Sequence, residues 1–503
     1  MRIKTFLLLL FLLSIKPFLI RSQQINTLYF MDDVPVRHFL NSSFQPIDDF
    51  YLSLPVIGFT QLSIGNNSLS LKDIIYNVNG QTVSFLSPLG NIPRFYATLR
   101  TNTMIQGDIQ TNLLSFGFRN KSAYWTFSLS EKLAITGNLP KELFRISLFG
   151  TPDNQINSFD FTKLEGDVSI YTEAALGYSR KIDAKWTVGG KLKLLLGSAN
   201  ISNTNNHFLL QAGVEQWNLK GEGTANYSGP LQINTANSIQ SFTYTAPTGF
   251  LDWLKPSGIG AGIDAGCEYK FNDNIKFSGA INDLGFIRWT RNTHNYQYSV
   301  DYSFNGINLF NSNSTINTFQ AVYNQIILGN GLVDTMITAF NSSTKSKLSS
   351  NSYITSTTAK INLGAEYSIL NDKLSFGFLS YSQFIKNILI EEMTGSVNAR
   401  PFTRMNASLS YSILNGRFST IGAGIAFKTG MFNWFAAADY IPFQTADLSL
   451  SNAGSPKINI PIPYNSTRFN FSAGMNIVFD KKEKRNKMQD RSYRNKNCQC
   501  DWN

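Results

Sequence analysis

The sequence has few of the residues that most catalytic and metal-binding sites require. Its 503 residues include only three cysteines and three histidines. Cys267 stands alone, and Cys498 and Cys500 are separated by one residue near the end, so no disulfide scaffold is predicted. The histidines are scattered, and no Ser/His/Asp arrangement or nucleotide-binding loop is found. The sequence therefore predicts no enzyme activity, no metal site and no cofactor.

Charge is also scarce, and it is unevenly placed. Only 15% of the residues are charged, whereas aromatic residues reach 13%. The segment 481–497 holds eight Lys or Arg against two acids, a net charge of +6 out of +11 for the chain. A basic groove or an interleaved basic and aromatic motif is not found elsewhere, so no nucleic-acid partner is expected. Low charge with many aromatic residues suits a surface that faces lipid.

Long apolar runs are missing as well. No stretch reaches the roughly 18 consecutive apolar residues of a membrane-spanning helix, which excludes helical membrane proteins. Arg2 and Lys4 precede the short apolar run 6–13, which is the layout of a secretory signal. We therefore expect a cleavable signal over residues 1–22, with Ser22 before the cleavage point. An uncleaved anchor helix is the disfavoured alternative, because Lys16 interrupts the apolar run.

What the sequence does contain is strict alternation of apolar with small or polar residues. In the 11-residue runs 259–269 and 469–479, the odd positions are apolar and most even positions are Gly, Asn, Ser or acidic. Successive side chains of a strand point to opposite faces, and about 9–11 residues suffice for a tilted membrane strand. A sheet in lipid has to close on itself. We predict an all-β protein, a transmembrane antiparallel barrel of about 14 strands (12–16) with long extracellular loops. The alternative is a secreted sandwich or adhesin.

The polar faces of these strands carry isolated charged residues, which become candidates for the barrel lumen. Asp283 and Arg288 form the most distinctive polar pair, and they are expected either to line a constriction or to hold a turn at a strand end. The candidate lumen-facing residues are Asp264, Glu268, Asp283, Arg288 and Glu366.

Short turns recur between the predicted strands. Each has an aromatic residue, an Asn- or Asp-rich turn and a basic residue before the next apolar position, a composition that tight turns favour. We expect them in the periplasm, with the Asn-, Ser- and Thr-rich segments outside. If 411–418 is a periplasmic turn, then 441–467 contains an extra strand or one turn is misassigned, and the sequence leaves both open. The turns are 178–186, 269–277, 367–376 and 411–418, and the expected outer loops are 200–206, 228–248 and 311–358.

Several motifs resemble those of a Bacteroidota family of outer-membrane β-barrel proteins of unknown function. They are the segments 28–37 (LYFMDDVPVR), 44–46 (FQP), 51–55 (YLSLP) and 281–289 (INDLGFIRW), and the final strand ending at Phe479. Relatives tend to have Asn-Pro-Ala where this chain has residues 41–43 (NSS), so a kink at that proline is not expected here. The resemblance implies an outer-membrane location and a fold similar to fatty-acid-transporter barrels. It implies no particular substrate.

Together these features predict four segments. They are a signal peptide (1–22), an N-terminal periplasmic or lumen segment (23–49), an outer-membrane β-barrel (50–479) and a basic flexible tail (480–503). The function expected is that of a porin-like channel or transporter for a small compound, with hydrophobic compounds as one candidate class. A scaffold barrel that holds a surface or secretion protein without transport is the alternative. The partners expected are outer-membrane lipid, a small hydrophobic ligand and a periplasmic or surface protein.

Overall fold

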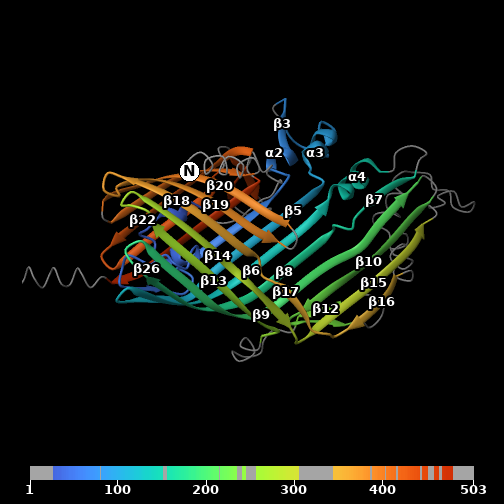
Figure 1. Cartoon of the computed structure of the whole chain (residues 1–503). Helices are drawn as coiled ribbons and strands as arrows, with labels where there is room; N and C mark the ends of the chain where they lie inside the picture. Colours follow the sequence, from blue (N-terminus) through green and yellow to red (C-terminus); the bar gives the residue numbers. More distant parts are fainter. Residues whose placement is uncertain are drawn as a thin grey trace, which may run out of the picture.

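The computed structural model of the chain shows a closed antiparallel β-barrel of 14 strands (Figure 1). The barrel closes because the first wall strand, made of β1 and β2, pairs with β5 on one side and with the last strand, β26, on the other. The predicted fold class and strand number are thereby confirmed. The structure describes residues 26–79, 81–150, 156–213, 216–234, 241–244, 256–304, 344–385, 388–402, 404–414, 417–441, 445–450, 458–463 and 467–479.

The wall strands follow one another around the barrel in chain order. They are β1 (Phe50–Ser53) with β2 (Thr60–Asn66), β5 (Asn102–Asn120), β6 (Ala123–Pro140), β8 (Glu165–Lys181), β9 (Trp186–Ala212), β13 (Gly258–Lys270), β14 (Ile275–Trp289), β18 (Ala359–Ile369), β19 (Leu374–Ile385), β20 (Ile388–Phe402), β21 (Met405–Leu414), β22 (Arg417–Thr429), β23 (Phe432–Ile441) and β26 (Arg468–Phe479).

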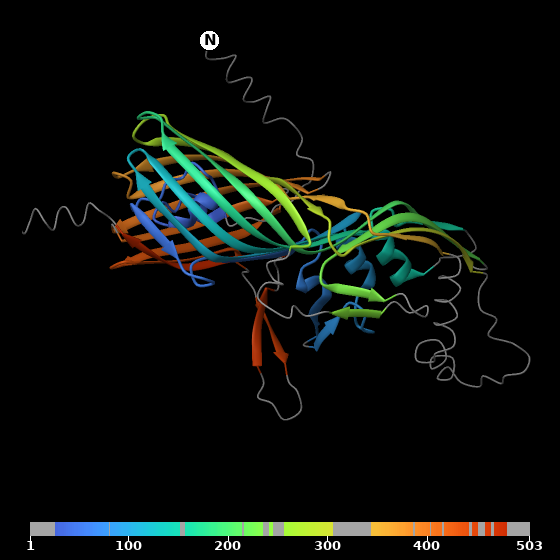
Figure 2. The same cartoon turned by 90° about the horizontal axis from the view of Figure 1, so that it is seen from below.

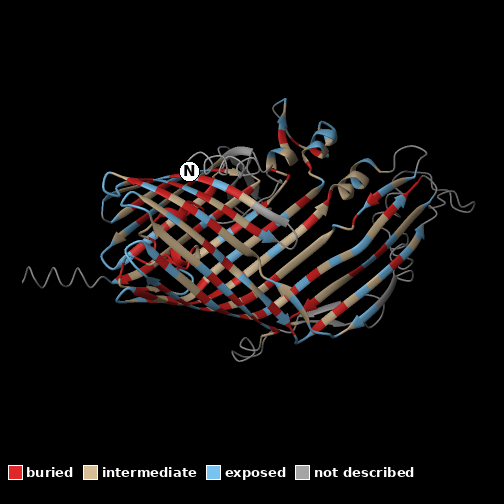
Figure 3. Cartoon of the chain, in the orientation of Figure 1, coloured by how far each residue is buried: buried red, intermediate tan, exposed pale blue. Residues whose placement is uncertain are grey.

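The two faces of the wall have opposite character. Large apolar side chains point outward, as Leu192 and Ile263 do with exposed fractions of 69% and 49%. Polar side chains on the same strands, such as Lys193 and Asp264, are buried inside. Figure 3 shows the resulting alternation of buried and exposed residues along the strands. This inside-out arrangement is the one that a barrel in lipid requires.

Short turns gather at the end of the barrel that also holds Phe50 and Phe479. They join β5 to β6, β8 to β9, β13 to β14, β18 to β19, β20 to β21 and β22 to β23. In the turn after β18, Leu370, Asn371 and Asp372 all have positive φ, which Asn and Asp tolerate best. The predicted aromatic, Asn/Asp-rich turns 178–186, 269–277 and 367–376 all lie at this end.

The fourth predicted turn, 411–418, lies at the opposite end. It joins β21 to β22. Strand β21 runs away from the end with the short turns, whereas the first strand of each other predicted pair runs toward that end. The parity conflict in the sequence therefore came from a misassigned turn. The segment 441–467 contains β24 (Thr445–Leu450) and β25 (Ile458–Pro463), which pair with each other and not with the barrel.

One side of the barrel is much taller than the other. Strand β9 has 27 residues, whereas β21 has 10. At about 3.3 Å per residue β9 is roughly 90 Å long, far more than a membrane needs. The end of the barrel opposite the short turns is called the upper end. The upper half of β9 belongs to a sheet that continues beyond the rim of the barrel and is called the extension below (Figures 1 and 2). The extension pairs upper β9 with β7 (Asn157–Asp160) and β10 (Trp217–Ser228), β10 with β15 (Thr293–Phe304), and β15 with β16 (Thr344–Ser349).

Short helices and ribbons surround this rim. Helix α4 packs through Leu143 and Ile146 against an apolar cluster around Phe159 of β7 and Leu210 of β9. Within the described residues no helix is long and apolar enough to cross a membrane. The remaining elements are α2 (Leu71–Ile74), β3 (Ile75–Val78), β4 (Gln81–Ser84), α3 (Ile92–Thr98), α4 (Lys141–Phe149), β11 (Leu231–Asn234), β12 (Ser241–Tyr244) and β17 (Tyr353–Ser356).

Residues 26–49 fill the barrel from inside and are called the plug below (Figure 2). They form the short helices η1 (Asn26–Phe30) and η2 (Pro35–Phe39). Helix η1 contacts β21, β22 and β23, and Leu28 and Met31 pack with Phe435 of β23 in a buried apolar cluster. The predicted signal (1–22), the basic tail (480–503) with Cys498 and Cys500, and residues 311–343 of the predicted outer loop lie outside the described residues.

The outward face generates a first prediction. Replacing Ile263 by Arg places a charge on the lipid-facing wall, which costs about 2–4 kcal/mol near the bilayer midplane. We expect the Ile263→Arg variant to assemble poorly, as measured by heat-modifiable migration in gels and by the free energy of unfolding in vesicles.

The matched control is Leu348→Arg. Leu348 is equally exposed, at 50%, but lies on β16 of the extension, beyond the barrel. We expect this variant to assemble like the unmodified protein. Equal behaviour of the two variants would contradict the lipid-facing position of Ile263.

Candidate functional site

The plug is held by asparagine side chains of the wall. Asn282 of β14 and Asn362 of β18 both donate an Nδ2–H to the carbonyl of Leu40, at 2.7 and 2.8 Å. Asn433 of β23 donates in the same way to the carbonyl of Asp33, at 2.8 Å. These bonds bind the backbone of the plug and not its side chains. At these points the fit between wall and plug therefore depends on the position of the plug backbone and not on the side chains that the plug carries.

Glycines on the inner face allow the plug to approach the wall closely. A side chain at position 377 would collide with the ring of Phe30, and one at position 364 would collide with that of Tyr29. The alternation of glycine with apolar residues thus has a structural reason in β18 and β19. Further inner-face glycines that touch the plug are Gly189, Gly266, Gly422 and Gly424.

The start of the plug is hydrogen-bonded to strands β21 and β23 of the wall. Asp439 of β23 accepts hydrogen bonds from the backbone N–H of Asn26, at 2.7 Å, and from the hydroxyl of Thr27. The Thr27 hydroxyl also lies 2.6 Å from that of Ser410 on β21. The buried carboxylate is satisfied by these donors, which fixes the end of η1 against β21 and β23.

A group of ion pairs near the short-turn end ties the middle of the plug to the wall. Plug Asp32 pairs with plug Arg37, and it accepts from Arg400 of β20 at 2.9 Å. Arg400 also lies 3.3 Å from Glu366, and Lys276 lies 3.7 Å from both acids. These five residues are called the basal cluster below. The segment 28–37, noticed for its family resemblance, thus contributes both plug charges.

A β-bulge in β14 prepares the second charged group. Between the pairs Ile263–Leu284 and Ala265–Ile281, strand β14 has one residue more than β13, and Asp283 there has a φ of 58°. A bulge shifts the alternation by one position, so neighbouring residues can point the same way. Both Asn282 and Asp283 consequently point into the lumen. Asp264 on β13 accepts the backbone N–H of Asp283, at 2.7 Å.

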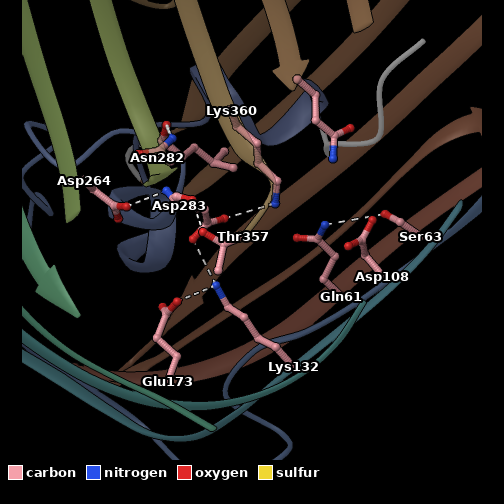
Figure 4. Close-up of polar contacts among 12 residues, drawn as sticks. Gln61, Ser63, Asp108, Lys132, Glu173, Asp264, Asn282, Asp283, Thr357 and Lys360 are labelled. Atoms are coloured by element: carbon pink, nitrogen blue, oxygen red, sulfur yellow. Dashed lines mark hydrogen bonds and ion pairs between the residues drawn. The ribbon is translucent and has the colours of Figure 1, made fainter. Parts of the chain in front are cut away.

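Three lysines of the wall meet at Asp283, and Figure 4 shows two of them, Lys132 and Lys360. Its carboxylate lies 2.6 Å from Lys193, 3.2 Å from Lys132 and 3.2 Å from Lys360. A single carboxylate cannot neutralise three ammonium groups, and two more acids complete the set. Glu173 lies 2.8 Å from Lys132, and Asp264 lies 2.7 Å from Lys193. The central cluster, as it is called below, comprises Lys132, Glu173, Lys193, Asp264, Asp283 and Lys360.

The structure places the five lumen candidates that the sequence predicted at different sites. Asp264 and Asp283 belong to the central cluster, and Glu366 belongs to the basal cluster. Glu268 is half-buried and lines a cavity beside the basal cluster. Arg288 lies on the exposed face of β14, opposite the buried Ile287, and donates to Ser352 at 3.3 Å. Arg288 is therefore not part of either cluster.

The sequence analysis missed the cations of both clusters. Lys132, Lys193, Lys360 and Arg400 each occupy an inner-face position of a strand, but a lysine in an alternating pattern resembles any exposed polar residue. A signal was present at residues 191 and 193 of β9, where two lysines alternate with Leu192 and Leu194. Two cations on one face of a long apolar strand require acids opposite them.

Two cavities are associated with the two clusters, and only the lower one is lined by plug residues. The upper cavity has a volume of about 360 Å³ and lies between the central cluster and the extension. The lower cavity has a volume of about 530 Å³ and lies among the basal cluster, Arg119 and the turn residues Lys121 and Lys181. In the described part of the chain no group of His, Cys, Asp or Glu is arranged to hold a metal ion.

The central cluster generates a second prediction. Asp283→Asn removes the carboxylate that three lysines share, and breaking a buried ion pair from one side typically costs about 3–5 kcal/mol. We expect the variant to lower the free energy of unfolding in vesicles by this order.

The matched control is Asp301→Asn in the extension. Asp301 lies 3.6 Å from Lys220, and both side chains are largely exposed. Such a pair contributes about 1 kcal/mol or less, so this variant should unfold like the unmodified protein. A loss of stability that is the same at both positions would contradict the role of the central cluster.

Comparison with known proteins finds solved structures that are similar in fold. No curated protein matches the sequence. Solved structures that are similar in fold include the toluene transporter TodX of P. putida, with 10% identity, a TM-score of 0.38, and coverage of 92% of this chain and 96% of that chain. A FadL homologue of Pseudomonas aeruginosa matches with 12% identity, a TM-score of 0.36, and coverage of 92% and 100%.

The sequence also matches a family model. The model describes a family of unknown function, DUF5723, and it matches residues 43–439. The motif at 281–289 lies inside this range, whereas the motif at 28–37 precedes it. The match covers most of the sequence, and the chain belongs to this family of unknown function, DUF5723.

Proposed function

We propose that the protein is an outer-membrane channel that passes a small solute when its own N-terminal plug moves. The proposal has two parts, which are the location of the barrel and its activity. Each part has its own support in the arrangement of the described residues, and each has its own test.

The outer face of the barrel supports the location. Its apolar side chains are bordered by aromatic pairs near the short turns, including Trp125 with Tyr178 and Trp186 with Tyr269, at ring-centre distances of 4.7 and 4.5 Å. Aromatic girdles at the interface and short turns on the periplasmic side are typical of outer-membrane barrels. The expected signal peptide and periplasmic tail agree with this location, and both remain predictions.

The activity is supported above all by the position of the plug inside the barrel. A barrel that only anchors a partner has no need of a movable segment in its interior. Here one continuous segment fills the barrel, and it lines the lower cavity of about 530 Å³, whereas the upper cavity of about 360 Å³ is lined by residues outside the plug. Within the described residues the segment is joined to the wall covalently at Phe50. A shift of the plug would connect the two cavities without a change in the wall.

The bonds that hold the plug fit such a movement. Wall asparagines bind its backbone, and the basal cluster binds Asp32 and Arg37 through exchangeable ion pairs. Water in an opened lumen can replace each of these partners, because all of them are polar. The apolar contacts of the plug, such as Leu28 and Met31 on Phe435, have no such substitute, so they oppose the movement.

The scaffold remains the second candidate, and the extension favours it. The upper half of β9 carries a sheet well beyond the membrane, together with α4 and exposed apolar residues such as Ile156, at 78% exposure. A surface of this kind can bind another protein. The following experiment separates the two functions.

A disulfide between plug and wall should close the channel. The hydroxyls of Thr27 and Ser410 lie 2.6 Å apart, so cysteines at both positions are placed to form a bond of about 2.05 Å. In a background with Cys267, Cys498 and Cys500 changed to Ser, we expect the oxidised Thr27→Cys/Ser410→Cys variant to reduce liposome swelling to the rate of empty liposomes. A reductant should restore swelling.

The matched control joins two wall strands and does not tether the plug, although Thr394 also accepts a hydrogen bond from Asn26 at 3.0 Å. The hydroxyls of Thr394 on β20 and Ser412 on β21 lie 2.8 Å apart. Oxidation of the Thr394→Cys/Ser412→Cys variant should leave swelling unchanged. If oxidation of the Thr27/Ser410 pair has no effect on a measurable rate, the plug is not the gate. If the unmodified protein never exceeds empty liposomes, the scaffold function is favoured.

The location has a separate test in intact cells. Asp273 lies in the short turn between β13 and β14, and its side chain is 96% exposed. In the same cysteine-free background, a membrane-impermeant maleimide should label the Ile156→Cys variant in intact cells. The Asp273→Cys variant should react only after the outer membrane is permeabilised. Labelling of Asp273→Cys alone in intact cells would reverse the orientation.

A further inference from the structure

The upper cavity has a lining that discriminates between classes of solute. We propose that it binds a small, uncharged, hydroxyl-rich solute of the size and chemistry of a monosaccharide. This inference rests on the proposed channel function for its biological meaning. The site itself contains no plug residue and is built by wall strands together with β10, β17 and residues 357–358. Its volume of about 360 Å³ lies in the range of small-ligand sites, about 300–1,000 Å³.

The charges at the floor of the cavity cancel. The central cluster contains three ammonium groups and three carboxylates, and each ammonium group lies within 3.2 Å of a carboxylate. An ion that entered would lose its water and find the charges of the central cluster already paired, which is costly. Two further carboxylates in the lining accept hydrogen bonds from neutral groups, Asp108 from Gln106 at 3.2 Å and Asp167 from Ser169 at 2.9 Å. These acids disfavour an anion, and a cation would meet Lys132 and Lys360 in the same lining.

The walls of the cavity offer donors and acceptors in both directions. Hydroxyl groups come from four strands, and amides come from three. A hydroxyl can both donate and accept, and so can a carboxamide. A ligand that carries hydroxyl groups can therefore form a hydrogen bond at most points of the lining, either as the donor or as the acceptor. The hydroxyl residues include Ser169 of β8, Ser202 and Thr204 of β9 and Thr355 of β17, and the amides include Gln61, Gln110 and Asn226.

Two tyrosines and six aliphatic or phenylalanine residues give the cavity its apolar patches. Tyr353 lies over Trp289, with ring centres 6.4 Å apart, and its hydroxyl donates to Asn200 at 2.9 Å. Tyr171 is buried in the same apolar cluster, with Ile287. Each ring has a polar tip in a hydrogen bond or beside the cluster and an apolar face. A sugar ring has the same division, because its C–H groups form apolar faces and its hydroxyls lie around the edge.

This lining does not suit a purely apolar compound. An aromatic hydrocarbon in the upper cavity would displace water from the hydroxyls and lysines without giving them new partners. Leaving buried polar groups unpaired costs more than a small apolar contact returns. The hydrophobic ligand expected from the sequence is therefore not the class that this cavity favours.

Binding can be measured without any transport. Full-length protein in detergent is titrated by calorimetry with three probes of one size, which are glucose, glucosamine as the cation and gluconate as the anion, and with toluene as the apolar probe. We expect glucose to bind, and we expect the Kd of each of the other three probes to be at least about tenfold higher than that of glucose. Removing the Tyr353 ring by Tyr353→Leu should weaken glucose binding about tenfold.

The matched control is Tyr367→Leu, at an outward tyrosine of β18 with 50% exposure. It should bind glucose like the unmodified protein. Tighter binding of toluene, glucosamine or gluconate than of glucose would overturn the inference, and so would no binding of glucose or equal loss in both variants. If glucose binds as expected but liposomes never swell, the binding site stands and the channel function fails. If liposomes swell and glucose does not bind, the reverse holds.

Discussion

The rest of the structure depends on one constraint, which is that a sheet in lipid must pair every backbone group and turn its apolar side chains outward. Closure of β1 and β2 onto β26 meets the first condition, and strict alternation meets the second. The inner face is then left to residues that are small or polar. In this protein that face has two uses, because its glycines and asparagines receive the plug and its charged residues form the two clusters.

The bulge in β14 shows how the wall departs from regularity at the site. Regular alternation would place Asn282 and Asp283 on opposite faces. The extra residue turns both inward, so that Asn282 binds the plug while Asp283 gathers three lysines. The hydroxyl of Thr357 donates to the carbonyl of Asp283 at 2.6 Å, which supports the irregular backbone. One local insertion thus connects the seat of the plug with the floor of the upper cavity.

Period-two alternation is a local property, so the sequence could predict the strands, their outward faces and the approximate number. Turn composition is also a local property, but it does not reveal at which end of the barrel a turn lies. Residues 411–418 have the same composition as the other predicted turns and lie at the opposite end. The acids at 264 and 366 were found as isolated charges on the polar faces of alternating runs, and Asp283 was found as part of a polar pair with Arg288. Their lysine partners come from distant strands, and only the pairing of the wall brings them together. The plug has no periodicity, and its fit depends on the complementary wall.

The two clusters differ in a way that bears on gating. The basal cluster contains plug residues Asp32 and Arg37, so a movement of the plug would break it. The central cluster is formed by β6, β8, β9, β13, β14 and β18 alone, and none of its ion pairs involves a plug residue. Its main link to the plug is indirect, through Lys191, which donates to the carbonyl of His38 at 2.6 Å and lies 4.0 Å from Asp264. Under the proposed function, selectivity would therefore belong to the wall and opening would belong to the plug.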